Sequence, residues 1–160
     1  MTDKTALVRV IIANLETAID SALAAANEAR ATATNKENAA ENRYDTLGLE
    51  AAYLAHGQSD RVVQLGDALK AFQHLTLNPD NHLEVTIGSL VSLEDEAGGQ
   101  RVVFIGPAAG GQVVNFEGTR VTIVTQQSPL GRALSAAACD DEVSAEIAGK
   151  FVTYTITSIC

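Results

Sequence analysis

The sequence predicts an α+β protein. An N-terminal antiparallel α-helical coiled-coil hairpin is expected over residues 1–77, and an antiparallel β-sheet domain with one short helix over residues 78–160. Residues 1–77 contain no proline and three of the twelve glycines, and they are rich in residues that favour helices. The second half holds all three prolines, nine glycines and short bursts of valine, isoleucine and threonine, which favour strands. The breaker cluster at residues 78–81 marks the predicted boundary.

Apolar residues recur with heptad spacing in the helical half. From Val8 to Ala33 the steps alternate between four and three residues, which is the repeat of a coiled-coil seam. A second seam runs from Tyr44 to Phe72, through Leu54 and the polar Gln58. These seams are narrower than the apolar stripe of a helix buried in a globule. We therefore predict a free hairpin. The alternative is a pair of helices that fold onto the second half as ordinary core.

The two predicted helices cover residues 4–32 and 39–76. Residues 32–38 contain no apolar side chain larger than alanine, so they are expected to form the turn between the helices. Asn38 followed by Glu41 has the pattern of a capping box at the start of the second helix.

Alternating apolar residues and turn signals predict the strands of the second half. The predicted strands cover residues 83–93, 101–105, 113–116, 119–125, 142–147 and 151–159. Ser128 and Pro129 are expected to open a short helix over residues 130–138, because serine caps helix N-termini and proline is favoured at the first helical position.

The charge balance narrows the function classes. The chain has 11 basic and 20 acidic residues and a formal net charge of −9, so phosphate backbones and anionic membranes repel it. We expect no direct sequence-specific nucleic-acid binding and no membrane binding. The N-terminal residues lack the pattern of a signal peptide, and the two cysteines form no disulfide framework. The expected location is the cytoplasm.

Several segments of the sheet half resemble the C-terminal domain of the bacterial GreA/GreB family of transcription elongation factors. They are residues 85–95, residues 140–143 with the strand at 154–159, and above all the complete Ser-Pro-x-x-Arg-Ala-Leu motif at residues 128–134. The resemblance implies an FKBP-like sheet domain that binds RNA polymerase, and a coiled coil that enters the secondary channel of that enzyme. The polymerase-binding residues implied by the motif are Ser128, Pro129, Leu130 and Arg132.

The resemblance also implies chemistry at the hairpin tip. There the family carries an Asp and a Glu three residues apart, which help to hold Mg²⁺ in the polymerase active site during transcript cleavage. In this sequence the Asp position falls on Thr34 or, in a second register, on Asn38, so neither register keeps the carboxylate pair. Glu37 and Glu41 are the candidate Mg²⁺ ligands, and with Asp45 they would share one helix face. Acidic residues that complement a helix dipole would produce the same pattern.

The implied role is therefore a regulator without intrinsic enzyme activity, which at most stimulates transcript cleavage by the polymerase itself. Two alternatives remain open at this stage. A self-associating coiled-coil protein would use the first seam between chains, with Gln58 specifying the register. A prolyl isomerase would use the sheet domain, but the only aromatic residues there are Phe104, Phe116, Phe151 and Tyr154.

Overall fold

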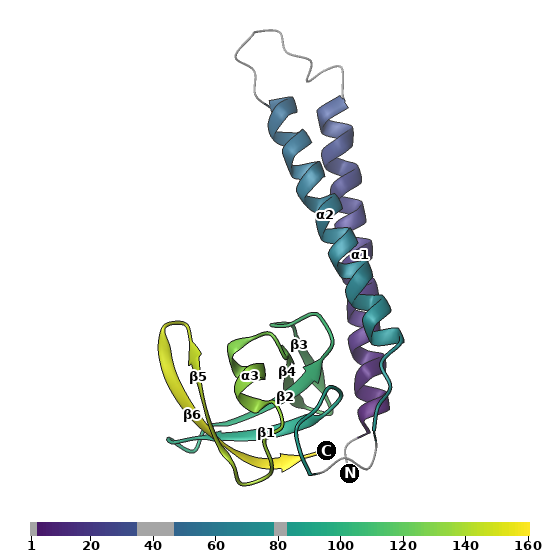
Figure 1. The fold of residues 1–160 in the computed structure, drawn as a ribbon. Helices are drawn as coiled ribbons and strands as arrows, with labels where there is room; N and C mark the ends of the chain where they lie inside the picture. Colours follow the sequence, from purple (N-terminus) through teal and green to yellow (C-terminus); the bar gives the residue numbers. More distant parts are fainter. Residues whose placement is uncertain (1–2, 35–46, 79–82) are drawn as a thin grey trace. The chain divides into compact units, whose positions relative to one another are not determined.

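A computed structural model describes residues 3–34, 47–78 and 83–160. It confirms the α+β class, with two long helices followed by a six-stranded sheet and a short helix (Figure 1). Helix α1 covers Lys4–Thr34 and helix α2 covers Leu47–Gln73. The chain packs as two compact units, one formed by Met1–Ile12 with Lys70–Cys160 and the other by Ala13–Leu69.

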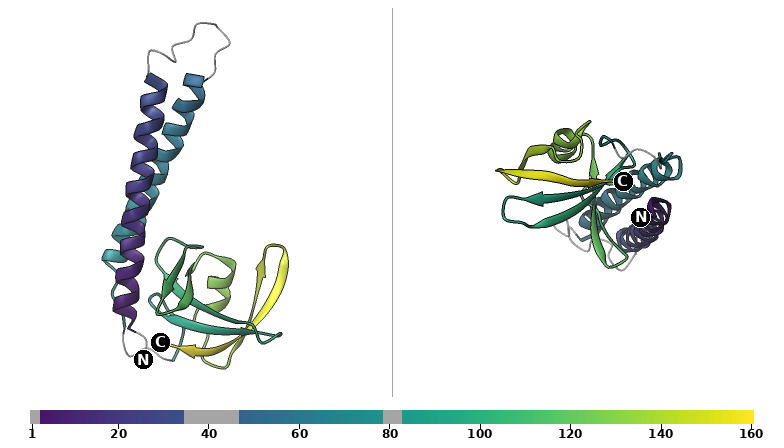
Figure 2. Two further views of the ribbon diagram at one scale, coloured as in Figure 1. Left: turned by 180° about the vertical axis from the view of Figure 1, so that it is seen from behind. Right: turned by 90° about the horizontal axis from the view of Figure 1, so that it is seen from below.

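In the unit Ala13–Leu69, α1 and α2 lie side by side and antiparallel (Figures 1 and 2). The seam predicted on α1 is confirmed there by four buried side chains. They are Leu15, Ala22, Ala26 and Ala29. Small side chains in the seam let the two helix backbones approach each other. The Arg30 guanidinium also donates a hydrogen bond to the Ser59 hydroxyl at 2.8 Å, which links the two helices.

The seam predicted on α2 is wrong at one position. The Leu54 side chain is 57% exposed, and the neighbouring Ala55 is buried in its place. The predicted path from Leu54 through Gln58 to Val62 takes two successive four-residue steps, which overshoot a repeat of 3.5 residues. A path through Ala55 reaches Val62 in one heptad and keeps the seam on the face toward α1.

The sheet contains six strands in the order β3-β4-β2-β1-β6-β5. The strands are β1 Leu90–Asp95, β2 Gln100–Gly106, β3 Val113–Phe116, β4 Thr119–Thr125, β5 Glu142–Ile147 and β6 Lys150–Ile159. The prediction of a wholly antiparallel sheet is wrong for one pair, because β2 and β4 are parallel. The β3–β4 hairpin places β4, and not β3, next to β2, and β4 runs in the same direction as β2.

The first predicted strand is shorter than expected. Residues 83–89 contribute only an isolated bridge between Glu84 and Ala138 before β1 begins at Leu90. The interruption is a turn at Gly88, which has a φ of +89°, a conformation that L side chains rarely adopt. The Ser89 amide donates to the Thr86 carbonyl at 3.1 Å and closes this turn.

Both faces of the sheet are covered by apolar side chains. Helix α3, Pro129–Leu134, places Leu130 and Leu134 in a core with side chains from β1, β2, β5 and β6. A second contact joins Phe72, at the end of α2, to Phe104 of β2, with ring centroids 6.4 Å apart. Gly106 is needed beside them, because a Cβ there would lie 3.0 Å from the Phe72 ring and 2.8 Å from a methyl group of Ile123.

The start of α1 belongs to the same unit as the sheet. Leu7 and Ile11 are fully buried. The Lys4 ammonium donates a hydrogen bond to the Asn78 carbonyl at 2.9 Å, and its burial lowers the pKa of Lys4 below the usual value. None of the helices in the described ranges is both long and apolar enough to cross a membrane.

Candidate docking site

The candidate site is built on the segment that joins β4 to α3. Ser128 is the N-cap of α3, as the sequence predicts, and its hydroxyl oxygen accepts a hydrogen bond from the Gly131 amide at 3.0 Å. The same hydroxyl donates to the Thr125 carbonyl at 2.8 Å, and the Ser128 amide donates to that carbonyl at 3.0 Å. Pro129 follows at the first helical position, where no amide donor is required. The end of β4 therefore holds the start of α3 in a defined position.

Gly131 determines how closely α3 approaches β4. It is buried, and a Cβ added to it would lie 1.9 Å from the Thr125 carbonyl oxygen. No side chain fits in that space without a shift of the backbone. On the exposed side of the helix, the Arg132 guanidinium donates a hydrogen bond to the Gln127 carbonyl. α3 ends at Leu134, earlier than predicted, and Ala136 soon after it has a φ of +59°.

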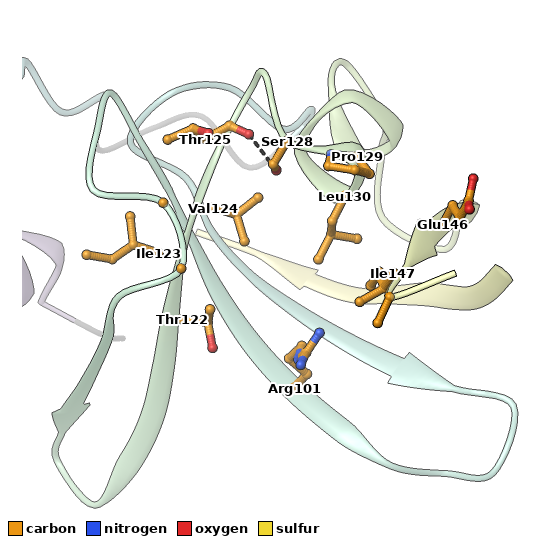
Figure 3. A pocket seen from close by; sticks show the side chains of 13 residues that line it. Arg101, Thr122, Ile123, Val124, Thr125, Ser128, Pro129, Leu130, Glu146 and Ile147 are labelled. Carbon is orange, nitrogen blue, oxygen red and sulfur yellow. Dashed lines mark hydrogen bonds between the residues drawn. The ribbon is translucent and has the colours of Figure 1, made fainter. Parts of the chain in front are cut away.

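An open pocket of about 470 Å³ lies beside this helix (Figure 3). It is lined by Arg101 of β2, residues 110–111 of the β2–β3 loop, residues 122–125 of β4, residues 128–130 at the start of α3 and residues 146–148 at the end of β5. We call this set the docking pocket. In Figure 3 the side chains of Val124, Leu130 and Ile147 converge on its interior. The pocket thus has an apolar interior and polar groups at its edges, which is the usual composition of a binding site.

The structure brings three of the predicted polymerase-binding residues together at this pocket. Ser128, Pro129 and Leu130 line it, whereas Arg132 lies on α3 outside the lining. The predicted tip residues Glu37, Glu41 and Asp45 lie outside the described residues, so their geometry is not part of the structure.

Sequence reasoning missed the residues that complete the pocket. Arg101 comes from β2, three elements before α3, and the pairing of β2 with β4 brings it to the pocket, whereas Ile147 ends β5, the strand that follows α3. Local periodicity in the sequence does not predict which residues of different strands lie close together in the folded protein. The sequence contains a weak indication that Gly131 has a structural role. Glycine disfavours helices, and yet Gly131 stands inside a helix of only six residues.

The C-terminal half of the chain matches a family model. The model is described as "Transcription elongation factor, GreA/GreB, C-term", and it matches residues 80–160, just over half of the chain. This chain belongs to the GreA/GreB family. All residues that line the docking pocket of this GreA/GreB member lie within residues 80–160, the part of the chain that the family model matches.

Solved structures of similar proteins were also compared. The GreA factor homolog 1 (Gfh1) of Thermus thermophilus is 20% identical with a TM-score of 0.39, over 93% of this chain and 94% of that chain. Gfh1 of Thermus aquaticus is 21% identical with a TM-score of 0.39, over 91% of each chain. A GreA/GreB elongation factor from Nitrosomonas europaea is 19% identical with a TM-score of 0.37, over 64% of this chain and 78% of that chain. A comparison with curated protein sequences finds no match.

The described part of this GreA/GreB member contains no group of three or more histidine, cysteine, aspartate or glutamate side chains that could hold a metal ion. His56 lies 3.6 Å from Asp60 on the exposed side of α2, an ordinary pair one helical turn apart. Cys139 and Cys160 are free thiols. The candidate Mg²⁺ ligands Glu37 and Glu41 lie outside the described ranges.

Proposed function

We propose that this GreA/GreB-family protein regulates transcription elongation by binding RNA polymerase through the docking pocket. The hairpin at residues 1–77 would enter the secondary channel, and the domain at residues 78–160 would hold the protein on the enzyme. The observation that supports this proposal is the pocket itself. Three of the four residues implied by the family motif, Ser128, Pro129 and Leu130, line one pocket with an apolar interior.

The local structure suits a surface that binds without rearranging. The Thr125 carbonyl and the Ser128 cap hold the start of α3, and the helix packs through Leu134 into the core. A rigid surface loses little conformational entropy on binding, so more of the contact energy appears as affinity. Pro129 is exposed on this surface and offers an apolar ring to a partner.

The hairpin suits a role as a probe. At 1.5 Å per residue, the 31 residues of α1 form a helix about 46 Å long. A helix pair of that length is longer than a small domain needs for its own core. Its seam is alanine-rich, so the pair is thin and fits a narrow channel.

A binding measurement tests the proposal. We expect Pro129→Asn to weaken binding to RNA polymerase about tenfold, because it replaces the exposed apolar ring at the pocket with a polar amide. Affinity is measured by fluorescence anisotropy with labelled full-length protein, and a thermal melt checks that the variant folds. If the wild-type protein fails to bind polymerase at low salt, or if Pro129→Asn binds as tightly as the wild type, the proposal is wrong.

The tip sequence predicts a regulator that does not stimulate cleavage. Since Thr34 or Asn38 stands where the family carries an aspartate, one ligand of the shared Mg²⁺ is missing in either register. A backtracked transcription complex incubated with this protein and Mg²⁺ should therefore show no shortening of the RNA. If the RNA is shortened, loss of that activity in Glu37→Ala or in Glu41→Ala identifies the register that supplies the metal ligand.

The two other functions have less support. No aromatic side chain lines the docking pocket, so it lacks a cradle for a proline ring. Between residues 13 and 34 the apolar seam of α1 is buried within the same chain, which leaves little of it for a second copy. A light-scattering mass twice that of the chain, with no polymerase binding, would favour self-association instead.

A further inference from the structure

The first part of α2 holds two large apolar side chains outside the seam between the helices. Tyr53 is 70% exposed and Leu54 is 57% exposed, whereas the small side chain of Ala55 is only 6% exposed. The buried face of α2 is therefore one residue, or about 100° around the helix axis, away from the larger apolar side chains. Rotation of this stretch by that angle would bring Leu54 into the seam and turn Ala55 out of it.

The sequence of α2 supports a seam through either residue. Val62 lies one heptad after Ala55, whereas Leu54 has another leucine one heptad before it, at position 47. A seam that passes through Leu54 must accommodate one extra residue before Val62, and coiled coils absorb such irregular spacing by a local change of winding. From Val62 onward the two seams share the same positions, among them the buried Leu65.

Gly57 lies where the two seams separate, and it suits a change of winding. A Cβ added at Gly57 would meet nothing within 4 Å, so packing does not require a glycine there. Glycine in the interior of a helix lowers its stability, because a residue without a Cβ has more backbone freedom than any other. At this position the same freedom allows the helix before Gly57 to turn relative to the helix after it.

Hydrogen bonds across Gly57 hold the register that the structure shows. The Arg30 guanidinium of α1 donates to the Ser59 hydroxyl at 2.8 Å, and that hydroxyl donates to the Ala55 carbonyl at 2.8 Å. The alanine-rich seam of α1 favours the same register, because Ala55 lets the two backbones stay close and Leu54 would separate them. Burial of the Leu54 side chain favours the rotated register instead. Two packings that each have a distinct stabilising contribution are the requirement for a two-state element.

We propose that residues 47–57 of α2 form a switch between two registers. In the observed register Ala55 lies in the seam, and Tyr53 and Leu54 face outward. In the rotated register Leu54 lies in the seam, Tyr53 moves to the edge of the seam and Ala55 faces outward. A partner that binds Tyr53 and Leu54 would hold the observed register, since a ligand shifts an equilibrium toward the state that it binds more tightly. The switch belongs to the hairpin itself and does not depend on polymerase binding.

A double-mutant cycle on the full-length protein tests the switch, with urea unfolding followed by circular dichroism. Leu54→Ala alone should raise the unfolding constant less than about threefold, because Leu54 is exposed. Ala55→Glu alone should raise it about tenfold, since rotation moves the carboxylate out of the seam. The double variant has only an alanine to place in the rotated seam, so its unfolding constant should exceed the product of the single effects about tenfold. Adjacent side chains on a helix do not face each other, so direct contact would not produce this coupling.

Val63→Ala provides the matched control, because Val63 is 63% exposed on α2 and lies in neither seam. Combined with Ala55→Glu, it should give only the product of the two single effects. In Ala55→Glu, nuclear Overhauser contacts between the Leu54 methyl groups and the buried alanines of α1 should strengthen relative to the wild type. Unchanged contacts, additive effects of Leu54→Ala and Ala55→Glu, or loss of the helical hairpin in Ala55→Glu would each overturn the inference, because a second register would prevent all three.

Discussion

Gly131→Ala is expected to displace α3 and to remove the docking pocket. The added Cβ would lie 1.9 Å from the Thr125 carbonyl oxygen and 2.7 Å from its carbon, and both are backbone atoms. A backbone group cannot rotate away as a flexible side chain can, so α3 must move out from the sheet. That movement withdraws Leu130 and Leu134 from the core. We expect the free energy of unfolding to fall by about 3 kcal/mol, the upper part of the usual range for an overpacked core.

A matched substitution controls for the intrinsic effect of alanine. Gly66 lies inside α2, and a Cβ there would meet nothing within 4 Å. Gly66→Ala should therefore stabilise the protein by about 1 kcal/mol, because alanine favours helices more than glycine does. Urea unfolding followed by circular dichroism measures both variants. A Gly131→Ala protein as stable as the wild type would show that α3 is not held against β4 as described.

Phe72→Ala is the second change for which a large effect is expected. The Phe72 side chain is 1% exposed, and its ring stacks near that of Phe104 at an interplanar angle of 28°. Truncation leaves a cavity next to β2, and such a change costs about 3–5 kcal/mol of the free energy of unfolding. Tyr53→Ala is the control on the same helix, because Tyr53 is 70% exposed and should change stability by no more than about 0.5 kcal/mol.

A double-mutant cycle tests whether the two rings act together. If Phe72 and Phe104 stabilise each other, the loss in the double variant should be about 1 kcal/mol smaller than the sum of the single losses. Additive losses would mean that each ring is buried independently of the other. In that case the contact between the end of α2 and β2 would stabilise the protein through buried apolar area alone, without a specific interaction between the two rings.

The sequence predicted the elements better than their arrangement. Heptad spacing located α1 and most of α2, because a helix with one buried face has apolar residues at regular positions in its own sequence. It failed at Leu54, where the four-residue step and the three-residue step both reach an apolar residue. The parallel pairing of β2 with β4 could not be predicted in this way, because apolar and polar residues alternate along a strand in the same manner whichever direction its neighbour runs.

The candidate site was predictable to a similar extent. Ser128 and Pro129 predicted a capped helix, which the structure contains. The family motif around them indicated a binding surface, and its residues 128–130 line the pocket. Arg101 gave no signal, because nothing near it in the sequence differs from an ordinary strand start. Arg101 and Leu130 come to the same pocket because β2 pairs with β4, which is a non-local property of the sheet.

The Thr125 carbonyl has a consequence for how the protein can change over evolutionary time. It accepts two hydrogen bonds from Ser128, one from the amide and one from the hydroxyl, and it closes the space above Gly131, so backbone atoms and this one hydroxyl set the spacing of one wall. The partly exposed Thr122 side chain can then be exchanged while that wall stays in place. The atoms that fix the position of this wall therefore differ from the side chain that a partner would contact. A substitution at that side chain can change which partner binds without changing the backbone around the pocket.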